Sequence, residues 1–288
     1  MKFLLPLLFA LQTLPAFADY CLESKIIEHE FNAADFKEVE LKALAGDLEV
    51  TSGDAGTIRF WGKVCTDTER HLNMIDLDIL KENGKLTLIA VIPYHQDDFD
   101  PSIALLDIEL TLPSEMPLRL RDSSGDMTVS DVSVTSIEDS SGDIRVRNGR
   151  ADLSVRDSSG QIYVRGVSGS VKVSDSSGDI DINNVDGDVE IPGDSSGDVE
   201  ISDVKGTVIV ARDGSGDIDI EHVGKDVLIG SDGSGDISIE DVKGMVRIEA
   251  DGSGSVRVDD VAGDFELSNK GDGEIRTSDI AGRINTPR

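Results

Sequence analysis

The chain has 288 residues, of which 57 are Asp or Glu and 27 are Lys or Arg, so its formal charge at pH 7 is −30. That charge argues against nucleic acids and anionic membrane surfaces as direct partners, because both are polyanions. A strongly acidic composition is also typical of disordered chains, but the regular spacing of Val and Ile residues described below argues for a folded one.

Residues 1–18 have the three-part layout of a secretory signal peptide. Lys2 supplies a positive charge, Phe3 to Leu14 is an apolar run, and Ala16-Phe17-Ala18 places small residues where a signal peptidase reads them. The run is shorter than the roughly 20 apolar residues that span a bilayer, and no later segment is apolar enough to do so. We therefore expect cleavage after Ala18, export to the periplasm or the cell surface, and no membrane span.

The chain has two cysteines, Cys21 and Cys65. In an oxidising compartment an even pair predicts a disulfide, and the alternative is two free buried thiols. A bridge between them would close a loop of about 45 residues, for which chain entropy predicts roughly 4 kcal/mol of stabilisation.

Residues 19–121 contain long, irregular stretches that predict strands. Asn83-Gly84 lies between two of these stretches and is a strong signal for a hairpin. We expect this region to start a stack of coils with wider turns and to cover its first edge, which would otherwise pair with other strands. The predicted strands are residues 36–44, 47–51, 57–64, 76–80, 86–92 and 103–112.

Residues 122–288 consist of repeats. The sequence Asp-Ser-Ser-Gly or Asp-Gly-Ser-Gly recurs at intervals of 17 to 19 residues, and a degenerate ninth unit begins at Lys270. Such a fixed period is the signature of a solenoid. The eight regular copies begin at Asp122, Asp139, Asp157, Asp175, Asp194, Asp213, Asp232 and Asp251.

The unit at residues 175–193 shows the pattern within one repeat. Ile180 and Ile182 alternate with acidic residues, and so do Val189 and Ile191. Alternation of β-branched residues predicts two strands, each with one buried face. Gly178 and Gly187 precede these strands and mark corners where we expect a positive φ.

These repeats predict an all-β fold, a single-stranded parallel β-helix (β-solenoid) of about 19-residue coils behind an irregular N-terminal β cap. One unit carries about five inward apolar side chains, too few for a core of its own, so units must stack. Neighbouring coils would then lie about 4.8 Å apart. An antiparallel sandwich would explain the alternation of residues but not the recurrence of one corner sequence at a fixed register.

The serial Ser-Gly-Asp-Ile/Val strands resemble those of the bacterial β-strand-repeat family labelled "putative adhesin", whose function is unknown. Leu110-Thr111-Leu112-Pro113, followed by Leu118-Arg119-Leu120-Arg121-Asp122, is similar to the entry of that family into its repeats. The resemblance covers most of the chain after residue 18. It implies a parallel β-helix and a location in the cell envelope, and it brings no catalytic residues.

Two columns of aspartates are expected along the stack. Stacked carboxylates about 5 Å apart repel by roughly 0.8 kcal/mol even in water, so something must offset the repulsion. Divalent cations such as Ca²⁺ could do so, but Asp and Ser before glycine also accept backbone hydrogen bonds in turns. We favour turn chemistry, with no cofactor and no metal. The alternative cation ladder would use Asp175, Asp179, Asp194, Asp198, Asp213, Asp217, Asp232 and Asp236.

The pattern indicates no catalytic site. Serines recur at the same corner of many coils, which predicts a ladder of hydroxyl groups, and the four histidines are scattered, which argues against a catalytic triad or a zinc site. A β-helix carbohydrate-active enzyme is an alternative, but the repeats lack aromatic sugar platforms and long insertions. We therefore expect a non-catalytic, adhesin-like scaffold of the envelope or surface that presents an acidic repetitive face to a protein or glycan. A calcium-stabilised binding solenoid is the third hypothesis.

Overall fold

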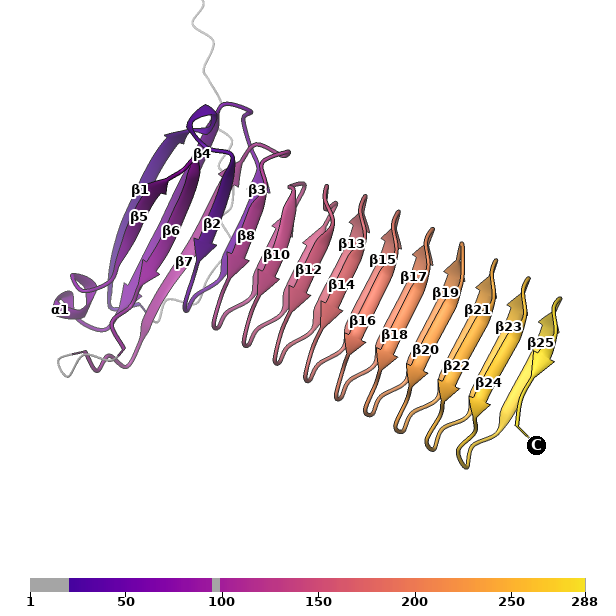
Figure 1. Ribbon diagram of the computed structural model, residues 1–288. Coiled ribbons are helices and arrows are strands. Elements are labelled where there is room, and N and C mark those ends of the chain that lie inside the picture. Colours follow the sequence, from indigo (N-terminus) through magenta and orange to yellow (C-terminus); the bar gives the residue numbers. More distant parts are fainter. Residues whose placement is uncertain (1–20, 95–98, 288) are drawn as a thin grey trace, which may run out of the picture.

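The computed structural model describes residues 21–94 and 99–287, which form an elongated stack of β coils (Figure 1). Within these residues there are two sheets of thirteen strands each. The helical elements of this part are one 3-10 turn at Ala33–Asp35 and the four-residue α1 (Glu69–Leu72), and no helix in it is long and apolar enough to cross a membrane. The predicted signal peptide at residues 1–18 lies outside the described residues.

Each repeat gives one strand to each sheet. In the coil that begins at Asp175, β15 (Ile180–Val185) belongs to the first sheet, called sheet A here, and β16 (Val189–Gly193) belongs to the second, called sheet B. Ile180 pairs in parallel with Val199, and Val189 with Val208, one coil later. The predicted parallel solenoid of about 19-residue coils is confirmed, and the antiparallel sandwich is wrong.

The strands of the two sheets follow each other in space as follows. Sheet A contains β1 (Glu23–Asn32), β4 (Thr57–Thr66), β7 (Ala104–Leu112), β3 (Leu48–Ser52), β9 (Met127–Ser130), β11 (Ile144–Arg147), β13 (Ile162–Val167), β15, β17 (Val199–Val204), β19 (Ile218–Val223), β21 (Ile237–Val242), β23 (Val256–Val261) and β25 (Ile275–Ile280). Sheet B contains β5 (Asp76–Glu82), β6 (Lys85–Val91), β2 (Glu38–Lys42), β8 (Leu118–Arg121), β10 (Val134–Glu138), β12 (Leu153–Arg156), β14 (Val171–Ser174), β16, β18 (Val208–Arg212), β20 (Val227–Ser231), β22 (Val246–Ala250), β24 (Phe265–Asn269) and β26 (Ile284–Asn285).

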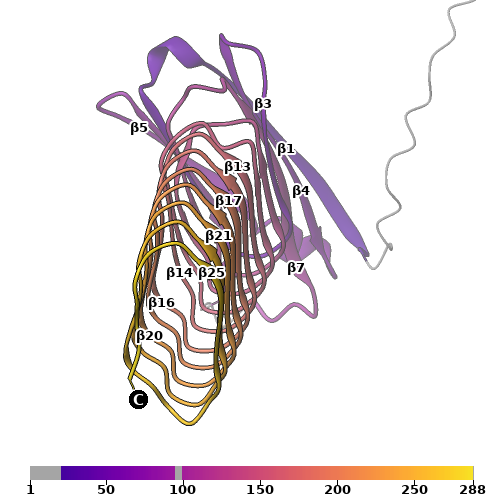
Figure 2. The ribbon, with the colours of Figure 1, turned by 90° about the vertical axis from the view of Figure 1, so that its right-hand side faces the viewer.

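The core is a narrow layer of apolar side chains between the two sheets. Figure 2, seen from the C-terminal end, shows the flattened cross-section of the stacked coils. The coil at residues 175–193 fills it with Ile180, Ile182, Val185, Val189 and Ile191, none of them more than 1% exposed. These are the five inward side chains expected from the pattern. β-branched side chains suit this layer because they pack well on a pleated surface with little rotamer freedom to lose.

A left-handed residue turns the chain at the end of each repeat strand in sheet A from β15 to β25. In β15 this residue is Asn184, with φ 59°, and the same position holds Asp203, φ 56°, and Asp241, φ 55°. The irregular backbone lets Val185 face the core although it follows Ile182 by three residues instead of two. Asn and Asp are the non-glycine residues that tolerate this conformation best, a signal that the sequence analysis did not use.

The two glycines of a repeat serve different purposes. Gly178 has φ +135°, and a Cβ there would lie 1.8 Å from the carbonyl oxygen of Gly160 in the preceding coil. Gly187 has no left-handed φ, but its Cβ would lie 2.7 Å from the carbonyl carbon of Gly169. The expected positive φ is therefore confirmed at Gly178 and wrong at Gly187, which is glycine because two coils approach closely there.

The N-terminal region starts the stack, but its order in space differs from its order in sequence. β2 and β3 form one coil that lies between the coil of β6 and β7 and the coil of β8 and β9, with parallel pairing on both sides. β4 then pairs antiparallel with β1 and β7, and β5 pairs antiparallel with β6 across the predicted Asn83-Gly84 hairpin. These antiparallel strands cover the first edge, as expected, while the division of the chain after residue 121 stays a prediction.

Cys21 and Cys65 form a disulfide with their Cα atoms 5.3 Å apart. Cys65 lies in β4, and Cys21 lies just before β1. The bridge therefore fastens the start of the outermost strand of sheet A to its neighbour. The predicted pairing is confirmed, and the alternative of two free thiols is wrong.

A Gly197→Ala substitution should lower the free energy of unfolding by about 2 kcal/mol or more, because an L-residue disfavours positive φ and the new Cβ would lie 2.1 Å from the carbonyl oxygen of Gly178. Gly193→Ala is the matched control, since a Cβ there meets nothing within 4 Å, and its effect should stay within about 0.5 kcal/mol. Urea unfolding followed by circular dichroism measures both, and equal effects would contradict the role given to Gly197.

Candidate functional site

The first aspartate of each repeat lies inside the solenoid. The side chain of Asp175, 6% exposed, is inward at the corner where sheet B ends, and its Oδ1 accepts a hydrogen bond from the backbone N–H of Ser176 at 2.6 Å. Asp194 accepts from Ser195 in the same way at 2.7 Å. The expected turn chemistry is confirmed in the five coils that carry Asp-Ser-Ser-Gly, but burial was not foreseen. The buried aspartate column consists of Asp122, Asp139, Asp157, Asp175, Asp194, Asp213, Asp232 and Asp251, each 4–7% exposed.

Every member of the buried aspartate column has at least one buried carboxyl oxygen without a hydrogen-bond partner among the described residues. Burial disfavours the charged form, and it raises the pKa of Asp122 to about 7 and that of Asp157 to about 6. Burial also raises the pKa of both Asp213 and Asp232, whose carboxyl groups contact each other. A proton on one carboxyl group supplies the donor that its neighbour lacks, so this column is suited to hold protons near neutral pH.

The aspartate that directly follows the Asp-Ser-Ser-Gly or Asp-Gly-Ser-Gly corner forms a second column, which lies at the surface. Oδ1 of Asp179 accepts from the backbone N–H of Asp198 at 3.1 Å, and Oδ1 of Asp198 accepts from that of Asp217 at 2.9 Å. Asp217 accepts in turn from Asp236 at 2.8 Å. These charge-assisted bonds join each coil to the next and offset the repulsion between stacked carboxylates. We call Asp179, Asp198, Asp217 and Asp236 the exposed aspartate column.

In both columns, carboxyl oxygens that a metal ladder would use as ligands accept hydrogen bonds from backbone N–H groups instead. The five buried aspartates from Asp122 to Asp194 accept local turn N–H groups, and the exposed ones accept N–H groups of the next coil. Within residues 21–94 and 99–287, no three His, Cys, Asp or Glu side chains converge in a way that could hold a metal ion. Calcium binding therefore stays an alternative, which a chelation experiment tests.

The expected hydroxyl ladder is present in part: Ser141, Ser159, Ser177 and Ser215 donate to a carbonyl oxygen of the preceding coil, whereas Ser196, Ser234 and Ser253 make no such bond among the described residues. The Oγ of Ser177 donates to the carbonyl oxygen of Ser158 at 3.1 Å, and that of Ser159 donates to the carbonyl oxygen of Ser140 at 3.2 Å. The hydroxyl groups in this ladder are engaged with backbone of the preceding coil. Their role is to hold successive corners together.

One histidine lies beside an aspartate and a serine. Nδ1 of His71 is 2.8 Å from Oδ1 of Asp67, and the hydroxyl and backbone N–H of Ser102 both donate to Oδ2 of Asp67. The contact with His71, followed by that with Ser102, holds the pKa of Asp67 below its usual range. Because the hydroxyl bonds to the carboxylate and not to the imidazole, this group is a clamp after β4 and not a nucleophile with its base. Sequence spacing gave no hint of this contact.

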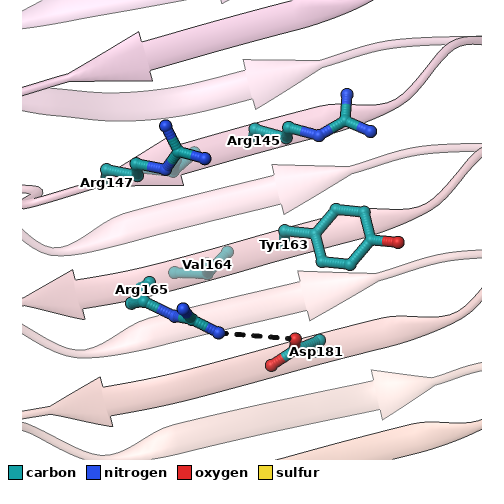
Figure 3. Close-up of a pocket in the computed structure, with 7 residues that line it drawn as sticks. Arg145, Arg147, Tyr163, Val164, Arg165 and Asp181 are labelled. Atoms are coloured by element: carbon teal, nitrogen blue, oxygen red, sulfur yellow. Dashed lines mark ion pairs between the residues drawn. The ribbon is translucent and has the colours of Figure 1, made fainter.

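A shallow basic pocket lies on the outer face of sheet A, with a volume of about 310 Å³ (Figure 3). Arg145 and Arg147 come from β11, Tyr163 and Arg165 from β13, and Asp181 from β15. Outward side chains of neighbouring strands meet here because they alternate along each strand. The pocket is lined by Arg145, Val146, Arg147, Tyr163, Val164, Arg165 and Asp181.

The basic pocket was not predicted from the sequence, although the charge distribution along the repeats signals it. Residues 122–174 contain six Lys or Arg and eight Asp or Glu, whereas residues 175–269 contain six and twenty-five. Tyr163 and Phe265 are the two aromatic residues of the repeats, and Tyr163 lies in this pocket, although no aromatic sugar platform was expected there. The net charge of the whole chain therefore does not show that residues 122–174 are nearly balanced in charge while residues 175–269 are strongly acidic.

Comparisons with known proteins find one family model and several similar solved structures. The family model described as Toastrack DUF4097 matches residues 32–202. A crystal structure titled "putative adhesin" from Bacteroides fragilis is similar at 14% identity and a TM-score of 0.41, over 88% of this chain and 97% of that one. A "putative cell adhesion protein" from Clostridium sporogenes is similar at 9% identity and a TM-score of 0.36, over 85% of this chain and 100% of that one. A search of the curated proteins found no match.

The buried aspartate column should make the protein more stable at pH 5 than at pH 8. Between about 3.9, the pKa of an unfolded aspartate, and about 6 to 7 for Asp157 and Asp122, the folded state binds more protons than the unfolded state. The free energy of unfolding therefore falls as pH rises through that window. Urea unfolding at several pH values measures this slope.

Asp157→Asn should flatten that slope, since it removes one titrating group while keeping the Oδ1 acceptor for the N–H of Ser158. The gain in unfolding free energy at pH 8, relative to pH 4.5, should be on the order of 2 kcal/mol. Ser238→Ala on the outer face of β21 removes no titrating group, so it is the control and should leave the slope unchanged. An equal slope in wild type and Asp157→Asn would contradict the proton-holding role.

Removing calcium should not change stability, because the Oδ1 atoms of the exposed aspartate column already accept backbone N–H groups. Thermal unfolding in EDTA and in about 2 mM Ca²⁺ should therefore give the same midpoint, whereas a ligand that binds only the folded state raises it. A midpoint several degrees higher in calcium would establish the calcium-stabilised solenoid instead.

Proposed function

We propose that this chain, which belongs to the Toastrack DUF4097 family, is a non-catalytic exported scaffold that presents an acidic, repetitive face to a partner at the cell envelope or surface. The family membership and the β-solenoid fold both support this proposal. A solenoid suits such a role, because it offers one long surface with side chains at a regular spacing.

The observation that carries the proposal is a stripe of outward carboxylates on sheet A. Asp181, Glu200 and Asp219 occupy paired positions in β15, β17 and β19. Partial burial, and then the charges of Asp181 and Asp219, raise the pKa of Glu200. These like charges repel each other, so a partner that brings Lys or Arg to this face relieves the repulsion and gains affinity. We call these three residues the acidic stripe.

Two further features support the proposal. A disulfide is typical of oxidising compartments outside the cytosol, which fits an exported protein. The hydroxyl groups of the serine ladder donate to backbone carbonyls, and Ser102 bonds to Asp67 rather than to His71. These contacts hold potential nucleophiles in structural roles.

The test is binding of residues 19–288, with the disulfide intact, to isolated envelope fractions and whole cells. The triple variant Asp181→Asn, Glu200→Gln, Asp219→Asn should bind at least about fivefold more weakly, since each exposed ion pair contributes up to about 1 kcal/mol. Binding of the wild type should also weaken as salt is raised. The triple variant Asn183→Ala, Ser202→Ala, Ser238→Ala on the same face is a control that keeps the charge.

Absence of binding to every envelope and cell preparation would contradict the scaffold proposal. New reducing ends released from plant or bacterial polysaccharides by the purified protein would contradict its non-catalytic part and would favour the carbohydrate-active enzyme. Both assays use the same protein preparation.

A further inference from the structure

The basic pocket contains two cations that face each other without sufficient counter-charge. Arg147 in β11 and Arg165 in β13 are direct partners in the parallel register, and like charges at such positions are destabilising. Arg165 reaches one carboxylate, Asp181, at 3.9 Å, and it stays 68% exposed. In the described part of the chain, no ion pair or side-chain hydrogen bond engages Arg147. The pair is therefore ready to receive an anion from solvent.

Tyr163 provides a flat aromatic surface beside these cations, and Figure 3 shows its ring face-on between Arg145 and Arg165. Its hydroxyl group is held by Gln161, whose amide donates to Oδ2 of Asp179 at 3.0 Å. The Arg145 guanidinium lies 5.3 Å from the centre of the ring and is fixed by Oδ2 of Asp143 at 2.7 Å. Ring and guanidinium are thus positioned before any ligand arrives, which lowers the entropy cost of binding.

The surroundings restrict the size of an anionic ligand. The coils that follow the pocket carry the excess of acidic residues, twenty-five against six basic ones in residues 175–269. A long polyanion lying along the rod would be repelled by them. A ligand with one or two negative groups meets mainly the local field of the three arginines, of which Arg145 already pairs with Asp143 and Arg165 with Asp181.

We propose that the basic pocket binds a short anionic saccharide, with a sugar ring stacked on Tyr163 and its carboxylate or sulfate group between Arg147 and Arg165. Guanidinium groups suit both anions, because their planar forks match two oxygens at once. The pocket volume, about 310 Å³, is at the lower end for small-ligand sites. An acidic peptide would also satisfy the arginines but would make no specific use of the flat ring. This site goes beyond the scaffold function, which uses the acidic stripe; the two surfaces adjoin at Asp181, which lines the pocket and belongs to the stripe.

Calorimetric titration of residues 19–288 at low salt tests the proposal with defined probes. These are digalacturonate for the carboxylate arm, 3′-sulfolactose for the sulfate arm, lactose as the neutral match, and a tetrapeptide of alternating Asp and Glu. At least one anionic sugar should bind with a Kd of about 1 mM or tighter, and lactose at least about tenfold more weakly. The arm that binds identifies the anionic group.

Arg147→Gln with Arg165→Gln should weaken that binding at least about fivefold, and so should Tyr163→Ala, because each removes one half of the site. Arg257→Gln with Arg276→Gln is the matched control. Those two arginines also pair in register on sheet A, but each has a carboxylate on its own strand or turn, at 3.6 Å from Asp259 and 2.7 Å from Glu274. This variant should bind like the wild type. Circular dichroism confirms that each variant folds.

The proposal is wrong if neither anionic sugar binds at about 10 mM, or if the Arg147→Gln, Arg165→Gln variant binds as the wild type does. Tighter binding of the acidic peptide, unchanged by Tyr163→Ala, would assign the pocket to a protein partner instead. Because these ligands are soluble and the acidic stripe is intact, failure here leaves the envelope-binding assay of the scaffold proposal unaffected.

Discussion

A single coil of this protein cannot bury its own apolar side chains, and the rest of the structure depends on that constraint. Five aliphatic residues per coil, such as Ile180 to Ile191, leave water only when coils lie on both sides. Close stacking then dictates where glycine must occur, since a Cβ at Gly178 or Gly187 would overlap the preceding coil. It also aligns every polar residue of the repeat into a column, so that hydrogen bonds between columns and backbone add to the ladders of the two sheets.

Alignment creates electrostatic strain, which the protein relieves in three ways. The exposed aspartate column accepts N–H groups from the next coil, the buried aspartate column has raised pKa values, and several surface carboxylates pair with Lys or Arg of a neighbouring coil, as Glu190 does with Lys172 at 2.7 Å. The acidic stripe and the Arg147–Arg165 pair have the least internal relief. A binding partner with complementary charge would relieve the most repulsion at these two places. Both proposed binding surfaces therefore lie on sheet A.

The rod is also asymmetric along its length. Its first repeats carry nearly balanced charge and hold the basic pocket, while the later ones are strongly acidic. At the N-terminal end, antiparallel strands and a disulfide close the stack, so that the parallel edge is not free to pair with other chains. At the other end β25 and β26 are more exposed than the strands before them, and Arg276 and Arg283 lie there. Exposed basic side chains disfavour edge-to-edge pairing.

Local patterns in the sequence determined the solenoid, its coil length, its inward residues and the Asn83-Gly84 hairpin, because periodicity and turn chemistry are properties of a few neighbouring residues. The disulfide could be predicted because the chain has only two cysteines. Only the tertiary structure decided three other things. It inserted the coil of β2 and β3 between strands from later in the chain, since long-range pairing has no local signature. It turned the first aspartate of each repeat inward rather than outward, because corner geometry sets that direction. It also brought Arg147, Tyr163 and Arg165 together from two coils, since residues 16 to 18 positions apart become neighbours only when coil length and register are known.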